Sequence, residues 1–144
     1  MRGLIWMYRH GWGPLLGPRL LMVEHVGRTT GRPRYVCLEV VDRPRPDTIV
    51  IVSGFGARAQ WYRNLRATPR CHVSTGRLRR VSADARFLPD DDAARVLARY
   101  RQAHPQLWRR LRGAIEHTVG RPVDSLPMVE LTLATAPGAP PRAR

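Results

Sequence analysis

The sequence predicts a small β-barrel with helices packed on its outside, a mainly β domain of the α+β class. About six runs of β-branched and apolar residues alternate with turns rich in glycine and proline. A helical pattern follows the third run, and two further helical patterns precede the last run. With 144 residues, the chain has the length of one domain with its own core.

The first half of the chain predicts three consecutive strands. Residues 20–26 (LLMVEHV) and 34–41 (RYVCLEVV) are expected to form the first two, joined by a tight turn at GRTTGRP. The proline-rich sequence DRPRPD, residues 42–47, is expected to be a turn into the third strand over residues 48–53 (TIVIVS). That third run is β-branched almost throughout, which is typical of a strand buried on both faces.

A short helix and two more strands are expected next. Trp61 and Leu65 are four residues apart, and Pro69 follows, so the helix should end before this proline. RCHVS and LRRVSADARFL predict two strands on either side of a turn at Thr75 and Gly76.

Two helices are expected before the last strand, MVELTL, residues 128–133. The first follows Pro89 and begins with three aspartates, which favour the positive end of a helix. The second lies between Pro105 and Gly120. The expected apolar stripes are Val96, Leu97 and Tyr100 in the first helix, and Leu107, Leu111, Ala114, Ile115 and Thr118 in the second.

The chain is expected to divide into a barrel domain and two terminal segments. Residues 20–134 would form the domain, and the Ala-, Pro-, Gly- and Arg-rich residues 135–144 a flexible tail. Residues 1–19 would be helical or surface-associated. Trp6 and Trp12 beside arginines are compatible with a membrane surface, but a short helix packed on the barrel is the preferred interpretation.

A cytoplasmic location is expected. No apolar run approaches the roughly 20 residues that cross a bilayer, and no signal-peptide pattern is present. Two cysteines in no metal or redox spacing, Cys37 and Cys71, are expected to be buried in strands. Peripheral membrane contact through residues 1–20 stays open as an alternative.

The charge of the chain is strongly positive. All 25 basic residues are arginines, against 11 acidic residues, and the formal charge is +14. Coding bias explains the absence of lysine, but it does not explain the scarcity of acids. Such a surface attracts nucleic acid, anionic lipid or a phosphorylated ligand. We expect no nucleic-acid partner, because the arginines are dispersed and no nucleic-acid module is recognisable.

The turn VGRTTGRPR combines the donors that phosphate recognition needs. Gly27 and Gly31 permit the backbone to turn tightly and expose N–H groups. Threonine hydroxyls add further donors, and an arginine side chain can donate hydrogen bonds to two phosphate oxygens at once. The alternative is a solvent-exposed hairpin turn whose arginines bind no ligand. The side-chain donors in question are Arg28, Thr29, Thr30, Arg32 and Arg34.

SGFGARAQWYRN, residues 53–64, is a second candidate site. Here a buried strand ends in a glycine-rich loop that passes directly into a helix, which suits a flat, polar-edged ring or an anion. Trp61 and Tyr62 could stack on such a ring, although core packing is the preferred interpretation for both. Asn64 can donate and accept hydrogen bonds.

The sequence shows no recognisable set of acid–base catalytic residues. The five histidines have no metal-ligand spacing, no nucleophile motif is present, and His72 is expected to be structural. Chemistry carried by a cofactor is therefore favoured. Because six strands enclose too little space for a ligand, a small molecule is expected to bind in an outer groove where the barrel opens or a strand meets a helix.

Four segments together resemble the deazaflavin-dependent nitroreductase and quinone reductase family, which uses coenzyme F-420 (8-hydroxy-5-deazaflavin). They are GRTTGRPR (27–34), IVIVSGFG, WYRNLRATP (61–69) and the terminal PMVEL strand, and the resemblance spans about residues 20–133. It implies a split β-barrel similar to the FMN-binding split barrels. It also implies hydride transfer from C5 of the reduced deazaflavin to a quinone, a nitro compound or an activated alkene.

The resemblance also implies which residues bind the coenzyme. For its phosphate and acidic glutamyl tail they are Arg28, Thr29, Thr30 and Arg34. For the deazaflavin ring they are Ile51, Val52, Ser53 and Gly54 from the strand and loop, and Gln60, Trp61 and Asn64 from the helix.

The sequence departs from the family pattern at three places. Thr29 stands where the family turn usually has lysine, so one charge contact is lost unless Arg32 replaces it. The loop before Trp61 is short, and RRLRGAIEHTVGR lacks the tyrosine-rich segment that closes the substrate pocket of nitroreductase-type members. A specific nitro substrate is therefore not implied.

Two other hypotheses stay open. The chain could bind a deazaflavin, FMN or a fatty acyl chain without turnover, or it could be a charge-driven binder of nucleic acid or an anionic membrane. For an oxidoreductase, the proton would come from solvent or from a nearby hydroxyl such as Ser53 or Tyr62. The sequence predicts no oligomeric state and no physiological acceptor.

Overall fold

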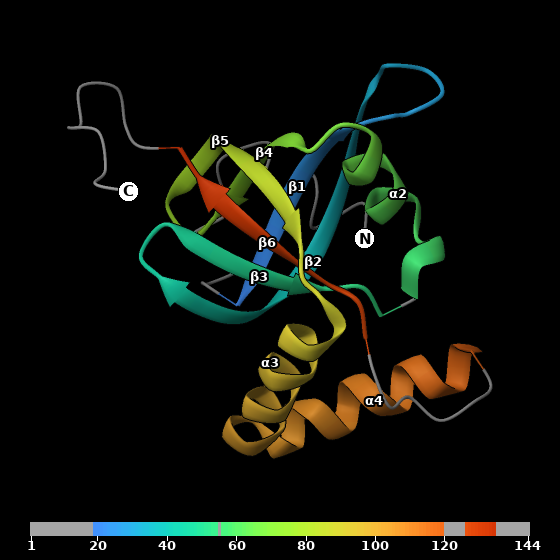
Figure 1. The fold of residues 1–144 in the computed structure, drawn as a ribbon, viewed down its shortest axis with the longest axis vertical. Coiled ribbons are helices and arrows are strands. Elements are labelled where there is room, and N and C mark those ends of the chain that lie inside the picture. Colours follow the sequence, from blue (N-terminus) through green and yellow to red (C-terminus); the bar gives the residue numbers. More distant parts are fainter. Residues whose placement is uncertain (1–18, 55, 120–125, 135–144) are drawn as a thin grey trace.

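The computed structural model describes residues 19–54, 56–119 and 126–134 (Figure 1). The strands are β1 (Leu20–Val26), β2 (Pro33–Arg45), β3 (Thr48–Val52), β4 (Arg70–Thr75), β5 (Leu78–Phe87) and β6 (Met128–Leu133). The helices are α2 (Gln60–Ala67), α3 (Asp90–Ala103) and α4 (Pro105–Val119), with a 3-10 turn, η2 (Gly56–Arg58), before α2.

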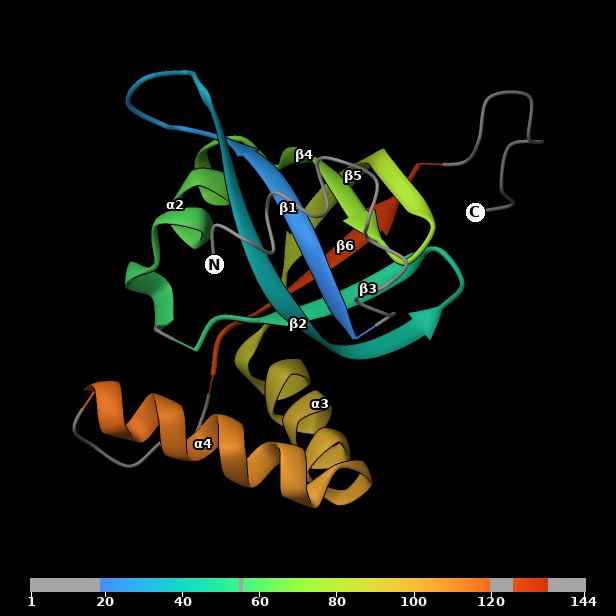
Figure 2. The ribbon, with the colours of Figure 1, turned by 180° about the vertical axis from the view of Figure 1, so that it is seen from behind.

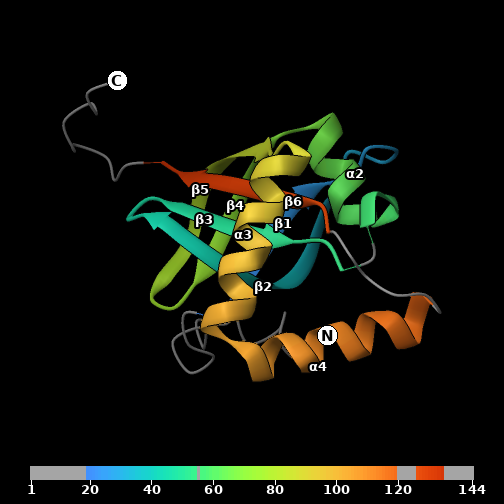
Figure 3. The same cartoon turned by 60° about the horizontal axis from the view of Figure 1, so that its bottom comes forward.

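The six strands close into one antiparallel barrel in the order β1-β2-β3-β6-β5-β4 (Figures 1 and 2). The prediction of a mainly β barrel with outer helices is confirmed. α2, which connects β3 to β4, lies beside one end of the barrel, and α3 and α4 lie together against another side (Figure 3).

β3 is buried on both faces, as its composition predicts. Ile49 and Ile51 point into the barrel core, where they meet the inward residues of the other strands. Val50 and Val52 point outward and pack against α3 and α4. A strand with apolar neighbours on both sides has no solvent face, which is why TIVIV shows no polar alternation.

The paired helices are attached through the apolar stripes that the sequence predicts. Val96, Leu97 and Tyr100 of α3 are buried, as is Ile115 of α4, while Leu107 and Leu111 are half-buried. Trp108 joins this cluster, and the Arg101 guanidinium lies over its ring. The stripe prediction is confirmed at these positions. The side chains of Ala114 and Thr118 lie outside the described residues.

β2 is longer than the sequence predicts. The expected strand ended at residue 41 and a turn followed over residues 42–47, whereas β2 continues to Arg45. Register shifts between Val40 and Asp42, and between Asp42 and Arg45, break the ladder with β3. Pro44 has no N–H to donate, so it is compatible with a strand where the ladder is already interrupted.

Two of the expected segments lie almost wholly outside the described residues. They are the N-terminal segment, of which only Arg19 is described, and the tail over residues 135–144. Among the described helices, none has the length and apolar character needed to span a membrane.

Leu131→Ala should destabilise the barrel strongly. Leu131 is fully buried in the barrel core, so truncation removes apolar contact and leaves a cavity that costs about 2–5 kcal/mol. The free energy of unfolding from urea titration measures this loss. Leu78→Ala is the matched control, because Leu78 is 45% exposed and its truncation should change stability by under about 0.5 kcal/mol. Equal losses for the two variants would contradict the core assignment.

Candidate functional site

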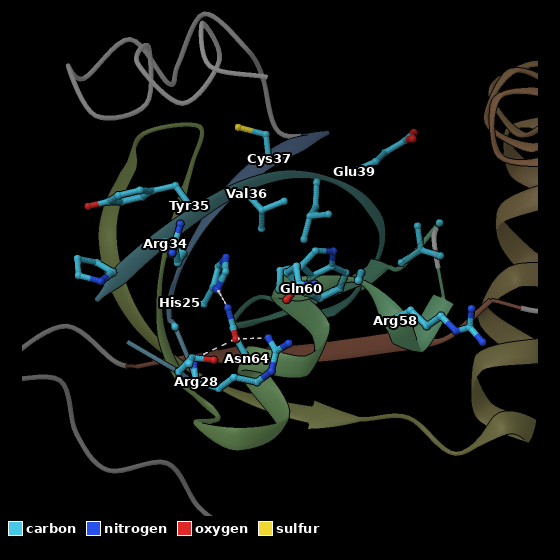
Figure 4. Close-up of a pocket in the computed structure, with 18 of the residues that line it drawn as sticks. His25, Arg28, Arg34, Tyr35, Val36, Cys37, Glu39, Arg58, Gln60 and Asn64 are labelled. Atoms are coloured by element: carbon cyan, nitrogen blue, oxygen red, sulfur yellow. Dashed lines mark hydrogen bonds between the residues drawn. The ribbon is translucent and has the colours of Figure 1, made fainter. Parts of the chain in front are cut away.

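A cavity of about 1110 Å3 opens between the β1–β2 hairpin, the first half of β2, α2 and α4. Figure 4 shows lining residues from the hairpin, from β2 and from α2, with His25, Asn64 and Arg28 next to one another. It lies on the outside of the barrel where a strand meets a helix, as expected. Its walls are His25, Gly27, Arg28, Thr29, Thr30, Pro33, Arg34, Tyr35, Val36, Cys37, Leu38, Glu39, Val52, Gly54, Arg58, Ala59, Gln60, Trp61, Asn64, Leu111 and Ile115.

The cavity exists because β2 has a strand partner on only one edge along its first half. β1 pairs with β2 from Pro33 to Glu39, but β3 joins β2 only at Val40. Among the described residues, the opposite edge of β2 before Val40 therefore has no strand neighbour. Here the barrel wall splits, and α2 and the loop before it stand opposite the open edge.

The open edge presents backbone donors and acceptors to the cavity. The Val40 N–H donates to the Arg19 carbonyl at 2.7 Å, so the backbone groups of Val40 point toward β1. Because direction alternates along a strand, the N–H and C=O groups of Tyr35, Cys37 and Glu39 point the other way. All three residues line the cavity. A flat ligand with a polar edge could pair with these groups as a further strand would.

The hairpin tip forms the cationic end of the cavity. Arg28, Thr29, Thr30 and Arg34 line the cavity and Arg32 does not, although all five residues are exposed. The turn is tight: the Gly27 N–H donates to the Arg32 carbonyl at 2.8 Å and the Gly31 N–H to the Gly27 carbonyl at 2.7 Å.

Both turn glycines are required by this geometry. Gly31 has a φ of 71°, and a Cβ on Gly27 would lie 2.8 Å from Thr30 Oγ1. Thr30 Oγ1 also accepts a hydrogen bond from the Arg32 N–H at 3.2 Å. Thr30 therefore supports the turn in addition to facing the cavity.

A hydrogen-bond network around the buried Asn64 fixes this tip to α2. Asn64 Oδ1 accepts from the Arg28 backbone N–H at 3.1 Å and from Arg28 Nη1 at 2.8 Å. Asn64 Nδ2 lies 3.0 Å from His25 Nδ1, and Figure 4 shows the three side chains in this order. His25 and Asn64 are each only 4% exposed. The network joins residues 36 and 39 positions apart in the sequence.

His25 is neutral at physiological pH. Burial, and secondarily the positive charge of Arg34, lowers the pKa of His25 to about 4. Asn64 Nδ2 is a donor, so His25 Nδ1 must accept and the ring proton must sit on Nε2. The sequence analysis did not identify His25 as a site residue, because a single histidine in a strand shows no ligand spacing.

The opposite end of the cavity is apolar and is built partly by α4. Leu111 and Ile115, one turn apart, line it beside Val52 and Trp61. A Cβ on Gly54 would lie 3.2 Å from two side-chain atoms of Ile115, so glycine there lets α4 approach the loop. The sequence analysis assigned Leu111 and Ile115 only to a packing stripe. Their place in the cavity depends on how α4 folds back.

The cavity contains one acidic side chain against three arginines. Glu39 accepts a hydrogen bond from Tyr100 Oη at 2.7 Å, which ties the β2 edge to α3. Burial, followed by this hydrogen bond, raises the pKa of Tyr100, so its hydroxyl stays protonated as the donor. The remaining charged side chains of the lining are Arg28, Arg34 and Arg58. The cavity therefore favours an anionic ligand.

Two of the residues expected to bind the coenzyme do not line the cavity. Ile51 is fully buried in the barrel core, because it lies on the inner face of β3 and Val52 on the outer face. Ser53 is 1% exposed, and its Oγ donates to the Gly56 carbonyl at 2.6 Å. The expected residues that do line the cavity are Arg28, Thr29, Thr30, Arg34, Val52, Gly54, Gln60, Trp61 and Asn64.

Several other residues from the sequence analysis have structural roles. Tyr62 packs edge-on against Phe87 with ring centroids 5.0 Å apart, which confirms core packing for this residue. Burial raises the pKa of Cys37 to about 11 and that of Cys71 to about 12, so both stay thiols. His72 Nδ1 lies 3.1 Å from Glu24 Oε2. The described part of the chain contains no group of side chains that could hold a metal ion.

Solved structures similar to this chain confirm the split-barrel fold. A structure described as a domain-swapped dimer has a TM-score of 0.59 at 18% identity, covering 90% of this chain and 94% of its own. The F420-H2 dependent reductase FDR-A has a TM-score of 0.53 at 20% identity, covering 78% and 93%. A pyridoxamine 5'-phosphate oxidase-related, FMN-binding protein from Nostoc punctiforme has a TM-score of 0.53 at 17% identity, covering 92% and 80%.

The family is shown by the sequence itself. No curated protein matches the chain. The family model described as F420H2-dependent quinone reductase matches residues 1–119, which is most of the chain. This chain therefore belongs to the F420H2-dependent quinone reductase family and is a reductase that depends on coenzyme F-420.

Proposed function

We propose that this protein transfers a hydride from reduced coenzyme F-420 to a quinone bound in the same cavity, with nitro compounds and activated alkenes as further acceptors. The observation that carries the proposal is one cavity with three successive environments. A cationic hairpin tip, an open backbone edge and an apolar wall follow one another around it. These environments match, in the same order, the phosphate and acidic tail of the coenzyme, its flat polar-edged ring, and an apolar electron acceptor.

The hairpin tip fits the phosphate and acidic tail of the coenzyme. Arg28 and Arg34 supply positive charge, and Thr29 adds a hydroxyl donor at the same end. The buried Asn64 accepts one hydrogen bond from Arg28 Nη1 and one from the Arg28 backbone N–H, so the guanidinium is already held in place before the anion binds. A preorganised guanidinium binds an anion more tightly than a mobile one of the same charge.

The open edge of β2 fits the ring of the coenzyme. Its backbone donors and acceptors at Tyr35, Cys37 and Glu39 suit the alternating polar edge of a deazaflavin. Trp61 and Gln60 of α2 face the same space from the opposite side. The coenzyme supplies the hydride when bound, and the protein supplies position and exclusion of water.

The apolar wall of α4 fits the electron acceptor. Leu111 and Ile115 bring a hydrocarbon surface next to Val52 and Gly54, where the strand reaches the cavity. An acceptor held there would lie beside the deazaflavin ring rather than beside the phosphate and acidic tail of the coenzyme. The proton that completes reduction of a quinone comes from solvent in this proposal, since neither Ser53 nor Tyr62 lines the cavity.

FMN is the alternative ligand. It has a flat ring and a phosphate, and one of the similar structures is an FMN-binding protein at 17% identity. A chain that bound FMN or a lipid without turnover would have the same cavity. Mixing the protein with reduced coenzyme F-420 and a panel of quinones, and following coenzyme oxidation by absorbance, separates these functions. Binding without oxidation by any acceptor would contradict the proposed reductase reaction.

A cytoplasmic location stays a prediction, and so does its alternative, in which residues 1–20 dock on a membrane surface. These residues lie almost wholly outside the described part of the chain, and the proposed quinone acceptors partition into bilayers. Flotation of the intact chain with liposomes, compared with a chain lacking residues 1–18, tests the docking. Equal flotation of the two chains would contradict it.

Arg28→Ala should weaken binding of coenzyme F-420 by about tenfold to a hundredfold, because hydrogen bonds to charged groups contribute about 1.5–3 kcal/mol. Titration of the oxidised coenzyme, followed by its fluorescence at moderate salt, measures the Kd. Arg32→Ala is the matched control, since it removes the same charge from a residue of the same turn that does not line the cavity. Equal losses for both variants would indicate a general charge effect.

Thr29→Lys should tighten coenzyme binding by up to about fivefold, since an added ion pair at an exposed site contributes about 0.2–1 kcal/mol. Thr29 lines the cavity at its cationic end and occupies the lysine position of the family turn. Arg32→Lys, which keeps the net charge, should leave the Kd unchanged. An unchanged Kd for Thr29→Lys at low salt would show that the anion does not reach this position.

Leu111→Ala should raise the KM for the quinone by severalfold while leaving the Kd of the coenzyme unchanged. Leu111 is half-buried at the apolar end of the cavity, so truncation removes acceptor contact at limited cost to stability. Steady-state kinetics and coenzyme titration measure the two quantities separately. A change in coenzyme Kd alone would place the ring, and not the acceptor, against α4.

A further inference from the structure

We propose that His25 is a ligand-binding residue of this cavity, whose Nε2–H donates a hydrogen bond to an oxygen atom of the bound coenzyme. Its Nδ1 atom simultaneously fixes the Asn64 amide and, through it, Arg28. This inference rests on the proposed function and adds to it a donor from β1. The residues expected from the sequence come only from the hairpin turn and the start of β2, from β3 and the loop after it, and from α2.

The orientation of the Asn64 amide is determined by its partners. Arg28 presents two donors to one end of the amide, at 3.1 and 2.8 Å, so that end must be the oxygen. The amide nitrogen is then the group 3.0 Å from His25 Nδ1. The reverse orientation would place the amide N–H groups against two Arg28 donors, which is unfavourable in a buried site.

The amide orientation in turn determines the state of the imidazole. If His25 Nδ1 carried a proton, two N–H donors would face each other. Nδ1 is therefore unprotonated, and the ring proton is on Nε2. Protonation of both nitrogens would require the Asn64 amide to turn and release Arg28. His25 is therefore held as a neutral donor with a single N–H group.

That N–H group has no hydrogen-bond partner in the described part of the chain, although His25 is 96% buried. Buried N–H groups are almost always satisfied, so a partner from outside the chain is implied. His25 lines the cavity, and Figure 4 shows the ring edge opposite Asn64 turned away from the amide. A ligand that fills the cavity would replace water as the partner of this N–H group.

The position of His25 indicates what kind of atom it meets. It pairs with Arg34 across the β1–β2 ladder, and its Asn64 contact leads to Arg28, so it lies between the two arginines of the cationic end. A neutral N–H donor flanked by guanidinium groups suits an oxygen that carries full or partial negative charge. Phosphate oxygens and the ring carbonyls of a deazaflavin both meet this description.

His25→Asn and His25→Gln separate the two functions of the ring. Asparagine places an acceptor near the Nδ1 position and no atom at Nε2, so it can keep the Asn64 contact while losing the ligand contact. Glutamine places an amide N–H group near the Nε2 position instead. His25→Asn should therefore weaken coenzyme binding by about tenfold, and His25→Gln should recover part of it. The thermal midpoint of His25→Asn should stay close to that of the unsubstituted protein.

Nitrogen NMR of the unsubstituted protein tests the inference without substitution. The ligand-free protein should show His25 in the Nε2-protonated form at pH 7. Saturation with oxidised coenzyme F-420 should shift the Nε2 and Hε2 resonances, and a deazaflavin lacking the phosphate and glutamyl tail should do so only if the ring carbonyl is the acceptor. Comparing the intact coenzyme with the truncated one therefore distinguishes a phosphate oxygen from a ring carbonyl oxygen as the acceptor.

Three outcomes would overturn the inference. They are an Nδ1-protonated ring, an Nε2 resonance that coenzyme leaves unchanged, and an unaltered Kd for His25→Asn. Each of these, observed while the unsubstituted protein binds coenzyme F-420, would leave the proposed function intact. Failure of the unsubstituted protein to bind the coenzyme would overturn both.

Discussion

The site depends on one backbone constraint, the open edge of β2 before Val40. β1 satisfies one edge of this segment, and β3 joins the other edge only where the register shifts begin. Backbone N–H and C=O groups need partners, so an open edge inside a folded protein has to face water, a side chain or a ligand. The remaining elements of the site are arranged around this gap, with α2 opposite it and the hairpin tip and α4 at its two ends.

The hairpin tip has its position because α2 holds it. Two hydrogen bonds from Arg28 to the buried Asn64 attach a charged turn to a helix of the barrel domain, and His25 completes the attachment from β1. An arginine-rich turn without this contact would repel itself and sample many conformations. With it, the Arg28 guanidinium is held against α2, and Arg28 and Arg34 border the same cavity.

The apolar end of the site follows from the two-sided burial of β3. The inner face of this strand builds the barrel core, while Val50 and Val52 on the outer face anchor α3 and α4. Gly54, at the end of the strand, removes the side chain that would keep Ile115 away. Core packing and the attachment of the helix that forms the cavity wall therefore both depend on the same strand.

The sequence by itself determined the strands, the helices and the cationic turn, because alternation, helical spacing and glycine-bearing turns are local properties. β1 and β6 have the predicted bounds, and the family resemblance identified nine residues that line the cavity. Only the tertiary structure decided which face of β3 reaches the cavity, which excludes Ile51 and Ser53 and adds Leu111 and Ile115 from a distant helix. It alone also showed His25 beside Asn64, since a hydrogen bond across 39 positions depends on how the barrel closes and leaves no pattern in the sequence.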